Sequence, residues 1–381
     1  MCNIIIETGA INNLKEHIVK EYMGYRIGII MQSQDLSRYR RYFKILKGLD
    51  IEVYFCDVDN CSDAVIADYT SQLQGVECII AIGEKGLIDI AKAVANSIGK
   101  SYYIVATSMN VLGMTSGSYM KRNEDGIVSK YLCDKPIAIF VDLNILQMLN
   151  SGEVANGLAW LLSCNLLVCK ALYDNIDRVD IERLDRMLRN VNIFTANNIL
   201  TIDGRKRLIK ILFEISLILD DISIDNTLLR INDIYTRFYK DKLSIGERNV
   251  VFAILLLSLH EKMLKGDIGM CKYDIAKRVE RLNLLFHNQT YVSNMVDNMR
   301  CDKDMLGNLR ENKEYYLKTI IRINNRILYN MSLLKRIYVD KGLIFNKVEV
   351  VSYINSLSLM ADMCDDRLVG VLRETGVLDN I

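Results

Sequence analysis

Two short segments of the sequence combine glycine, hydroxyl and charged residues in places where a ligand could bind. The first, Gly83-Glu84-Lys85-Gly86, lies between the apolar run 78–82 and a helical pattern that follows directly. Glycines at such a turn let the backbone approach a ligand closely, and Lys85 could neutralise a phosphate group. Because Glu84 would repel a phosphate, a purely structural strand-to-helix turn explains this segment equally well.

The second segment follows the apolar run 102–105 and extends from Thr107 to Ser116. Its hydroxyl and amide side chains suit a ribose, a phosphate or a polyol held by neutral hydrogen bonds. Capping of the next helix by Ser and Thr is the alternative interpretation. The candidate ligand-binding residues are Gly83, Lys85, Gly86, Thr107 and Ser108.

The first part of the chain alternates short apolar runs with helical patterns. This alternation is typical of a parallel sheet covered by helices on both faces. We therefore predict an open, mostly parallel α/β domain over residues 1–150. Both candidate segments then lie beyond the carboxyl ends of strands, where helix N-termini direct amide groups toward phosphates. The predicted strands are 25–31, 51–56, 78–82, 102–105 and 137–141.

After residue 150 the pattern becomes purely helical, with apolar residues at spacings of three and four. The sequence predicts an all-α domain over residues 151–381. Asn150-Ser151-Gly152 is the expected boundary, because Ser caps helices and Gly tolerates turns. The predicted helices include 153–172, 208–219, 247–265 and 315–338.

The overall charge excludes one class of function. The 381 residues include 48 basic and 47 acidic side chains, which leaves a formal charge of +1. Nucleic-acid binding needs a surplus of Lys and Arg to displace phosphate counterions, so we predict no nucleic-acid partner. The Arg- and Lys-rich segment 300–345 is interpreted as a solvated helical face, because acidic residues are interspersed in it.

The sequence predicts a cytoplasmic protein without a membrane span. Its N-terminus has no basic region followed by a long apolar stretch, so no secretory signal is visible. The most apolar run, 250–259, is half of the roughly 20 residues that a membrane span requires, and we interpret it as a buried helix. The ten Cys form no C-x-x-C pair, and reduced, mostly buried thiols are the expected state.

An ordered set of motifs extends over nearly the whole chain. Ile5–Ile11 is a strand-like run with a Gly-containing turn, and after Gly83 the residues Asp89, Ala91 and Lys92 complete an apolar-apolar-Asp-x-Ala-Lys pattern. Together with the motifs at 107–116, 136–143, 154–158 and 366–378, these resemble the iron-containing alcohol dehydrogenase and dehydroquinate synthase-like superfamily. Its glycerol-1-phosphate dehydrogenase branch is the nearest match.

This resemblance implies a nucleotide site at the mouth of the sheet and a metal site in the cleft between the two domains. In the superfamily, NAD(H) or NADP(H) exchanges a hydride with a small, often phosphorylated, polyol or ketone. A divalent zinc, iron or nickel ion, held by one Asp and two His, polarises the substrate oxygen. The resemblance also suggests a homo-oligomer, and it leaves a protein partner open.

The chain departs from the family pattern at the metal-ligand positions. The family Asp corresponds to Trp160, the only Trp of the chain, and the last family His corresponds to Ile245. The other ligand has no counterpart, since residues 161–259 contain no His. Two phosphate-loop glycines are also replaced, by Glu84 and Lys85. We therefore expect that the divalent metal is absent and that Trp160 and Ile245 lie near each other in the cleft.

The other metal-capable residues are weak replacements. The histidines are interpreted as ordinary core or surface residues. Asp220, Asp221 and Asp225 could bind a cation, but an acidic helix end or turn explains them as well. The three histidines are His17, His260 and His287.

Three functions remain open on this basis. The first is a divergent glycerol-1-phosphate dehydrogenase-like oxidoreductase that has lost the metal-dependent reaction. The second is a catalytically inactive family member that acts as a binding, sensor or assembly subunit. The third is a changed reaction on the same scaffold, since fold alone does not determine chemistry.

Overall fold

The computed structural model describes residues 2–57, 61–123, 128–224, 227–239, 243–269, 303–337, 350–363 and 366–378, with short pieces between 276 and 293. By its internal contacts the chain divides into two units. The first comprises Met1–Gly157 and Phe194–Asp221, and the second comprises Leu158–Ile193 and Ile222–Ile381. The division between 150 and 151 stays a prediction from sequence, whereas the contacts group residues 194–221 with the sheet.

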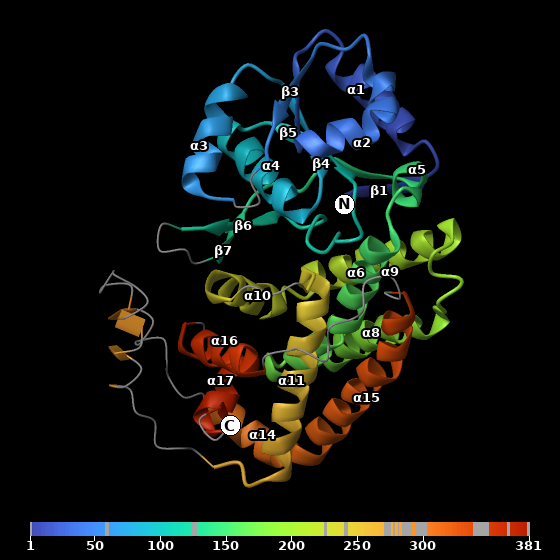
Figure 1. The fold of residues 1–381 in the computed structure, drawn as a ribbon. Coiled ribbons are helices and arrows are strands. Elements are labelled where there is room, and N and C mark those ends of the chain that lie inside the picture. Colours follow the sequence, from blue (N-terminus) through green and yellow to red (C-terminus); the bar gives the residue numbers. More distant parts are fainter. Residues whose placement is uncertain are drawn as a thin grey trace. The chain divides into compact units, whose positions relative to one another are not determined.

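The first unit is built on a six-stranded parallel sheet in the order β1-β8-β5-β4-β2-β3. Figure 1 shows this sheet with its helices. The predicted α/β fold class is therefore confirmed. The strands are β1 (Asn3–Glu7), β2 (Ile27–Met31), β3 (Ile51–Phe55), β4 (Cys78–Gly83), β5 (Ser101–Ala106) and β8 (Ala138–Asp142). A separate antiparallel pair, β6 (Ser118–Arg122) and β7 (Val128–Leu132), is an addition that the apolar pattern did not predict.

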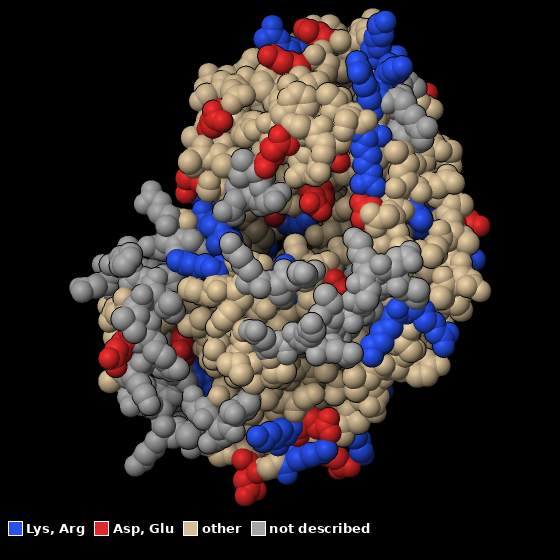
Figure 2. Space-filling view, in the orientation of Figure 1, with Lys and Arg blue, Asp and Glu red and all other residues tan. Residues whose placement is uncertain are grey.

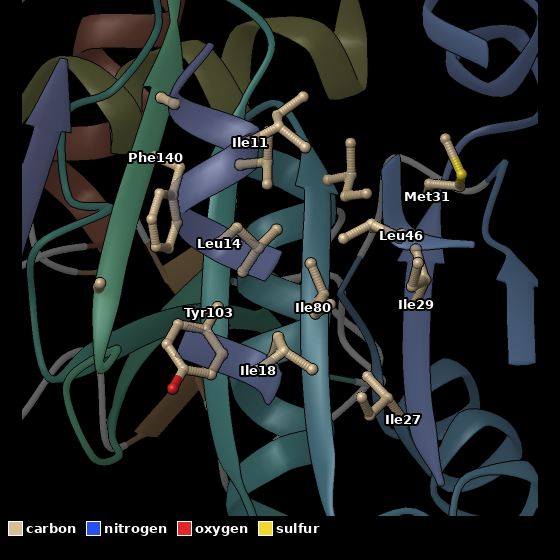
Figure 3. Packing of buried hydrophobic residues seen from close by; sticks show 14 of the residues in the cluster. Ile11, Leu14, Ile18, Ile27, Ile29, Met31, Leu46, Ile80, Tyr103 and Phe140 are labelled. Carbon is tan, nitrogen blue, oxygen red and sulfur yellow. The ribbon is translucent and has the colours of Figure 1, made fainter. Parts of the chain in front are cut away.

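Helices cover both faces of this sheet, and α1 and α4 each bury a stripe of apolar residues. On one face, Leu14 and Ile18 of α1 pack against alternate residues of the strands, such as Ile80 and Phe140 (Figure 3). Full burial of each such side chain contributes roughly 1.5–3 kcal/mol. The helices of this unit are α1 (Ala10–Tyr22), α2 (Ser33–Phe43), η1 (Lys44–Leu46), α3 (Asp63–Gln72), α4 (Lys85–Ile98), α5 (Leu143–Gln147) and α9 (Ile202–Asp221).

The helix that leaves the sheet domain, α6 (Ser151–Ser163), begins with a reciprocal cap. The backbone N–H of Glu153 donates to Asn150 Oδ1 at 3.0 Å, and the Asn150 N–H donates to Glu153 Oε2 at 2.7 Å. Asn150, rather than Ser151, is thus the capping residue. Arg38 of α2 holds the same Glu153 through both of its carboxylate oxygens, at 2.8 and 3.0 Å.

The second unit is helical in its described part. Helices α11 and α15 pack along each other, and a capping box of Ser244 and Glu247 fixes the start of α11. The helices are α7 (Leu166–Tyr173), α8 (Arg178–Leu188), η2 (Arg189–Ile193), α10 (Thr227–Phe238), α11 (Ile245–Lys265), α14 (Lys303–Glu311), α15 (Lys313–Ile337), α16 (Val350–Met363) and α17 (Arg367–Glu374).

The distribution of surface charge and the burial of the most apolar helical segment relate to two predictions from the sequence. Basic and acidic side chains are interspersed on the visible face (Figure 2), as the near-neutral composition implies. Among the described residues, one segment, Ser151–Tyr173, is long and apolar enough to cross a membrane, and 94% of its most apolar window is buried. Such burial is typical of a core helix.

Candidate functional site

The candidate site lies at the carboxyl edge of the parallel sheet in the first unit. Strands β2 and β4 are neighbours, yet the helices that follow them cover opposite faces. Tyr39 of α2 belongs to the cluster on the α1 face, whereas the missing Cβ of Gly83 would face Leu87 of α4 on the other side. Such a switch point is where open α/β sheets bind ligands.

The first predicted loop joins β4 to α4 at this point. Gly83 ends the strand, and a Cβ there would lie 3.2 Å from the Leu87 side chain, so the glycine allows close packing of helix on strand. Helix α4 starts at Lys85 and Gly86 without a side-chain cap. Its first N–H groups therefore remain suitable for an anion.

The charge of Lys85 is already neutralised within its own helix. Its Nζ donates to Asp89 Oδ2 one turn further on, and the two side chains are only 13% and 7% exposed. The predicted pairing of Lys85 with a phosphate would have to compete with this ion pair. The backbone amides at the start of α4, rather than the charge of Lys85, are thus the groups that remain for an anion.

The second predicted loop follows β5. Thr107 is 5% exposed, and its hydroxyl interacts with the carboxyl group of Asp35 in the first turn of α2. Burial raises the pKa of Asp35 to about 6, against the lowering effect of Arg38. Ser108 Oγ accepts the backbone N–H of Asn110 at 3.2 Å, which closes a local turn. Asp35 is a site residue that was not among the predicted ones, and its place in the first turn of α2, directly after β2, is the signal that could have revealed it.

Lys92 fixes the far end of this loop. Its buried ammonium group donates to the carbonyl oxygens of Gly113, Ser116 and Ser118 at 2.7, 2.8 and 3.0 Å. Burial lowers the pKa of Lys92 to about 8. The Lys of the Asp-x-Ala-Lys pattern therefore has a structural task here, which is to hold the loop against α4.

Helix α9 completes the loop from within the same unit. Ser216 Oγ accepts the N–H of Gly113 at 3.0 Å, and Thr115 donates to Asp220 Oδ2 at 2.8 Å. Gly113 has φ 78°, a conformation that favours glycine. Asp220, considered above as a cation ligand, is thus a hydrogen-bond acceptor for the loop.

The described residues do not fit the divalent metal of the family. No group of three or more His, Cys, Asp or Glu side chains that could hold a metal occurs in the described part of the chain. Trp160 is 1% exposed within α6, whereas Ile245 is 43% exposed in the first turn of α11. Their predicted proximity stays a prediction.

The histidines of the described segments are engaged elsewhere. His260 is fully buried, its Nδ1 lies 2.8 Å from the Tyr173 hydroxyl, and burial lowers its pKa to about 3. His17 packs edge-on against the rings of Tyr103 and Phe140. Both are core or packing residues, as predicted; His287 and Asp225 lie outside the described residues.

The burial of His260 predicts a pH-dependent stability. The unfolded chain binds a proton at this residue below pH 6.5, while the folded chain resists protonation down to about pH 3, so acid favours unfolding. Between pH 7 and pH 5 we expect a loss of about 2 kcal/mol in the free energy of unfolding of the second unit. Urea titrations at both pH values measure it.

The matched control for this prediction is His260→Leu. The variant should be less stable at pH 7, yet its stability should vary less with pH than that of the wild type. Asp35 acts with the opposite sign, because its raised pKa favours the folded state in acid, and it is unchanged in both proteins. An equal pH dependence of the two proteins would contradict the assignment to His260.

The sequence of the sheet domain matches a known protein family. Residues 5–148 match the family model described as iron-containing alcohol dehydrogenase, and this range contains the sheet and both loops. No curated protein sequence matches the chain significantly.

Solved structures resemble the chain over nearly its full length. An iron-containing alcohol dehydrogenase from Corynebacterium glutamicum is 12% identical, with a TM-score of 0.62 over 98% of this chain and 94% of that one. A probable glycerol dehydrogenase from Sinorhizobium meliloti is 14% identical, with a TM-score of 0.60 over 99% and 96%. An archaeal alcohol dehydrogenase from a Red Sea brine pool is 12% identical, with a TM-score of 0.64 over 100% and 96%.

Together these findings confirm the predicted resemblance to the superfamily, in sequence over residues 5–148 and in fold over nearly the whole chain. The chain has the fold of the iron-containing alcohol dehydrogenases, and its sheet domain carries their sequence pattern. At 10–14% identity the structural neighbours establish the fold alone. The glycerol-1-phosphate branch stays a prediction.

Proposed function

We propose that this protein binds NAD(H) or NADP(H) at the carboxyl edge of β4 and β5 and has lost the metal-dependent hydride transfer of its superfamily. The match of residues 5–148 supports the nucleotide site, because it includes both candidate loops. The uncapped start of α4 supports it independently. The protein then acts in the cytoplasm as a nucleotide-binding or sensor subunit, and a changed reaction on the same scaffold is the alternative.

One observation carries the loss of the metal reaction. Trp160, which the sequence pattern aligns with the family Asp, is buried, and the fully buried His260 is paired with Tyr173. A catalytic metal needs three protein ligands and an open position for substrate. The described residues supply no such set.

The residues at the carboxyl edge of the sheet suit binding of a nucleotide, but they do not replace the metal in hydride transfer. The first N–H groups of α4 would bind a phosphate, and the Thr107 and Ser108 hydroxyls lie at the end of β5, where the proposal places the ribose. A bound nicotinamide would supply a hydride donor or acceptor. Without a Lewis acid, the developing charge on a substrate oxygen would lack its main stabilisation.

Gly86→Asp is expected to abolish nucleotide binding without harming the fold. An acid in the first turn of α4 interacts favourably with the helix dipole but repels a phosphate bound at the same place. Titration of NADH fluorescence should show at least a tenfold weaker affinity, while the thermal midpoint stays equal or rises slightly. The matched control is Gly75→Asp, because Gly75 is exposed and precedes β4 at the opposite end of the strand. Equal NADH binding by Gly86→Asp and wild type would contradict the proposed site.

The loss of the metal reaction is tested separately. We expect purified protein, incubated with zinc, iron or nickel and desalted, to contain far less than one metal equivalent while it still binds NADH. Elemental analysis and NADH titration on the same sample measure both quantities. Stoichiometric metal, together with NADH oxidation that depends on a small phosphorylated ketone, would overturn the proposal.

A further inference from the structure

A pocket of about 530 Å³ lies between η2 and the middle of α15, entirely within the second unit. Three guanidinium groups, three carboxamides and one tyrosine line it. They include Arg189, Asn192, Arg322, Asn325, Arg326 and Tyr329. All of these groups can donate hydrogen bonds, and none of the described residues that line the pocket carries a carboxylate.

The three arginines converge on one buried carboxylate behind the pocket, that of Asp185 in α8. Asp185 Oδ2 accepts from Arg189 Nη2 and Arg322 Nη1, both at 2.6 Å, and Oδ1 accepts from Arg326 Nη2 at 2.7 Å. These arginines hold the pKa of Asp185 at about 2, despite its burial. The carboxylate therefore stays charged at every physiological pH.

The three arginines differ in their exposure and in the number of hydrogen bonds that they donate within the protein. Arg326 is only 9% exposed and also donates to Asn165 Oδ1 at 2.8 Å, so it is a packing residue. The solvated-face interpretation is wrong for this side chain. Arg189 and Arg322 are 60% and 44% exposed. In the described segments they bond only to Asp185, through two nitrogens of Arg189 and one of Arg322.

One carboxylate cannot balance three guanidinium groups. Two positive charges remain in excess within a few ångströms, and their mutual repulsion would be offset by a second anion. A neighbouring pocket of about 410 Å³ shares Arg189 and Arg322, and it adds Arg178, Arg186 and Lys318 against Glu182. Lys318 is paired with Glu314 at 2.7 Å and Arg178 with Glu182 at 3.1 Å. The basic side chains that remain across both pockets are Arg186, Arg189, Arg322 and Arg326, and the acidic one is Asp185.

We propose that this arginine pocket binds a small phosphorylated metabolite, whose phosphate group sits on the free edges of Arg189 and Arg322. Guanidinium groups bind phosphate oxygens in a two-pronged geometry, which explains arginine rather than lysine at both positions. The carboxamides of Asn192 and Asn325 and the exposed ring of Tyr329 would contact the organic part. The volume lies in the usual range for small-molecule sites.

A small molecule fits these observations better than nucleic acid. The excess of arginine gathers in two adjoining pockets, and the chain as a whole carries nearly equal numbers of basic and acidic residues. Nucleic-acid surfaces instead distribute Lys and Arg over an extended stripe. The site also lies outside the unit that carries the proposed nucleotide site, so either proposal can fail without the other.

Calorimetric titration of the full-length protein with ribose 5-phosphate and with inorganic phosphate tests the pocket. We expect both to bind, ribose 5-phosphate more tightly, while ribose alone does not bind. The double variant Arg189→Gln/Arg322→Gln should bind ribose 5-phosphate at least tenfold more weakly. Arg336→Gln is the matched control, because Arg336 is exposed on the same helix and lies outside the pocket.

Two further measurements keep the proposal falsifiable. Circular dichroism and NADH binding of the double variant should equal those of the wild type, which separates loss of the pocket from loss of the fold. Thermal stabilisation by phosphate should exceed that by sodium chloride at equal ionic strength. Unchanged affinity in the folded double variant, equal stabilisation by chloride, or no binding of either phosphate would overturn the assignment.

Discussion

Trp160→Asp is expected to unfold the second unit instead of restoring a metal ligand. The indole is 1% exposed, so the substitution removes a large buried side chain and places an unpaired carboxylate in the same apolar space. The cavity alone costs about 3–5 kcal/mol, and the buried charge adds to it. Urea unfolding followed by circular dichroism should show that the variant lacks the cooperative transition of this unit.

Trp160→Phe is the matched control. Trp160 Nε1 is buried and finds no hydrogen-bond partner among the described residues, so phenylalanine loses volume but no hydrogen bond. Its cost should be about 1 kcal/mol, within the usual range for a change between large apolar side chains. If Trp160→Asp instead folds and binds one zinc equivalent, the position has kept its role as a ligand site, and the proposed loss of metal chemistry is wrong.

Gly204→Ala is expected to destabilise the first unit severely and to abolish nucleotide binding together with it. A Cβ at Gly204 would lie 2.0 Å from the carbonyl oxygen of Asn198, and the next two nearest atoms are also backbone. Backbone cannot rotate away as a side chain can, so the start of α9 must shift, at a cost of about 3 kcal/mol or more. Because α9 holds Gly113 and Thr115 through Ser216, the loop after β5 should loosen as well.

Gly307→Ala is the matched control, and we expect it to stabilise the protein where Gly204→Ala destabilises it. Gly307 lies inside α14, and nothing is within 4 Å of its Cβ position. Alanine should therefore stabilise the protein by about 0.5–1 kcal/mol through helix propensity. Thermal unfolding and NADH titration of both variants measure the contrast. Equal stability of the two variants would contradict the prediction, because it would show that the backbone at Asn198 moves without a loss of free energy of unfolding.

The central sheet could be predicted from sequence because its strands are buried on both faces. Continuous apolar runs such as Ile27–Met31 and Cys78–Gly83 leave little ambiguity when helical patterns separate them. The β6–β7 pair was missed because its strands, for example Val128–Leu132, are only half-buried and mix polar with apolar residues. Pairing outside a core leaves a weak periodic signal.

The site was predictable only as far as it depends on local sequence. The loops after β4 and β5 follow from strand ends and glycine positions, and the structure places both at the carboxyl edge of the sheet. The engagement of Lys85 with Asp89 and of Thr107 with Asp35 arises from packing. The convergence of Arg189 and Arg322 on Asp185 joins segments far apart in the chain, and no pattern within either segment indicates it.

The placement of 194–221 in the first unit has a consequence for biosynthesis. The sheet and its loops are translated well before α9, and residues 158–193 of the other unit emerge in between. Until residue 221 has left the ribosome, the Lys92-bound loop lacks Ser216 and Asp220, and the carbonyl oxygens of Leu146 and Leu149 lack Arg205. Domains usually fold in order as they emerge. Here the first unit can be completed only after translation has passed more than half of the chain, and a fragment that stops at residue 157 would lack the α9 residues that hold the loop after β5.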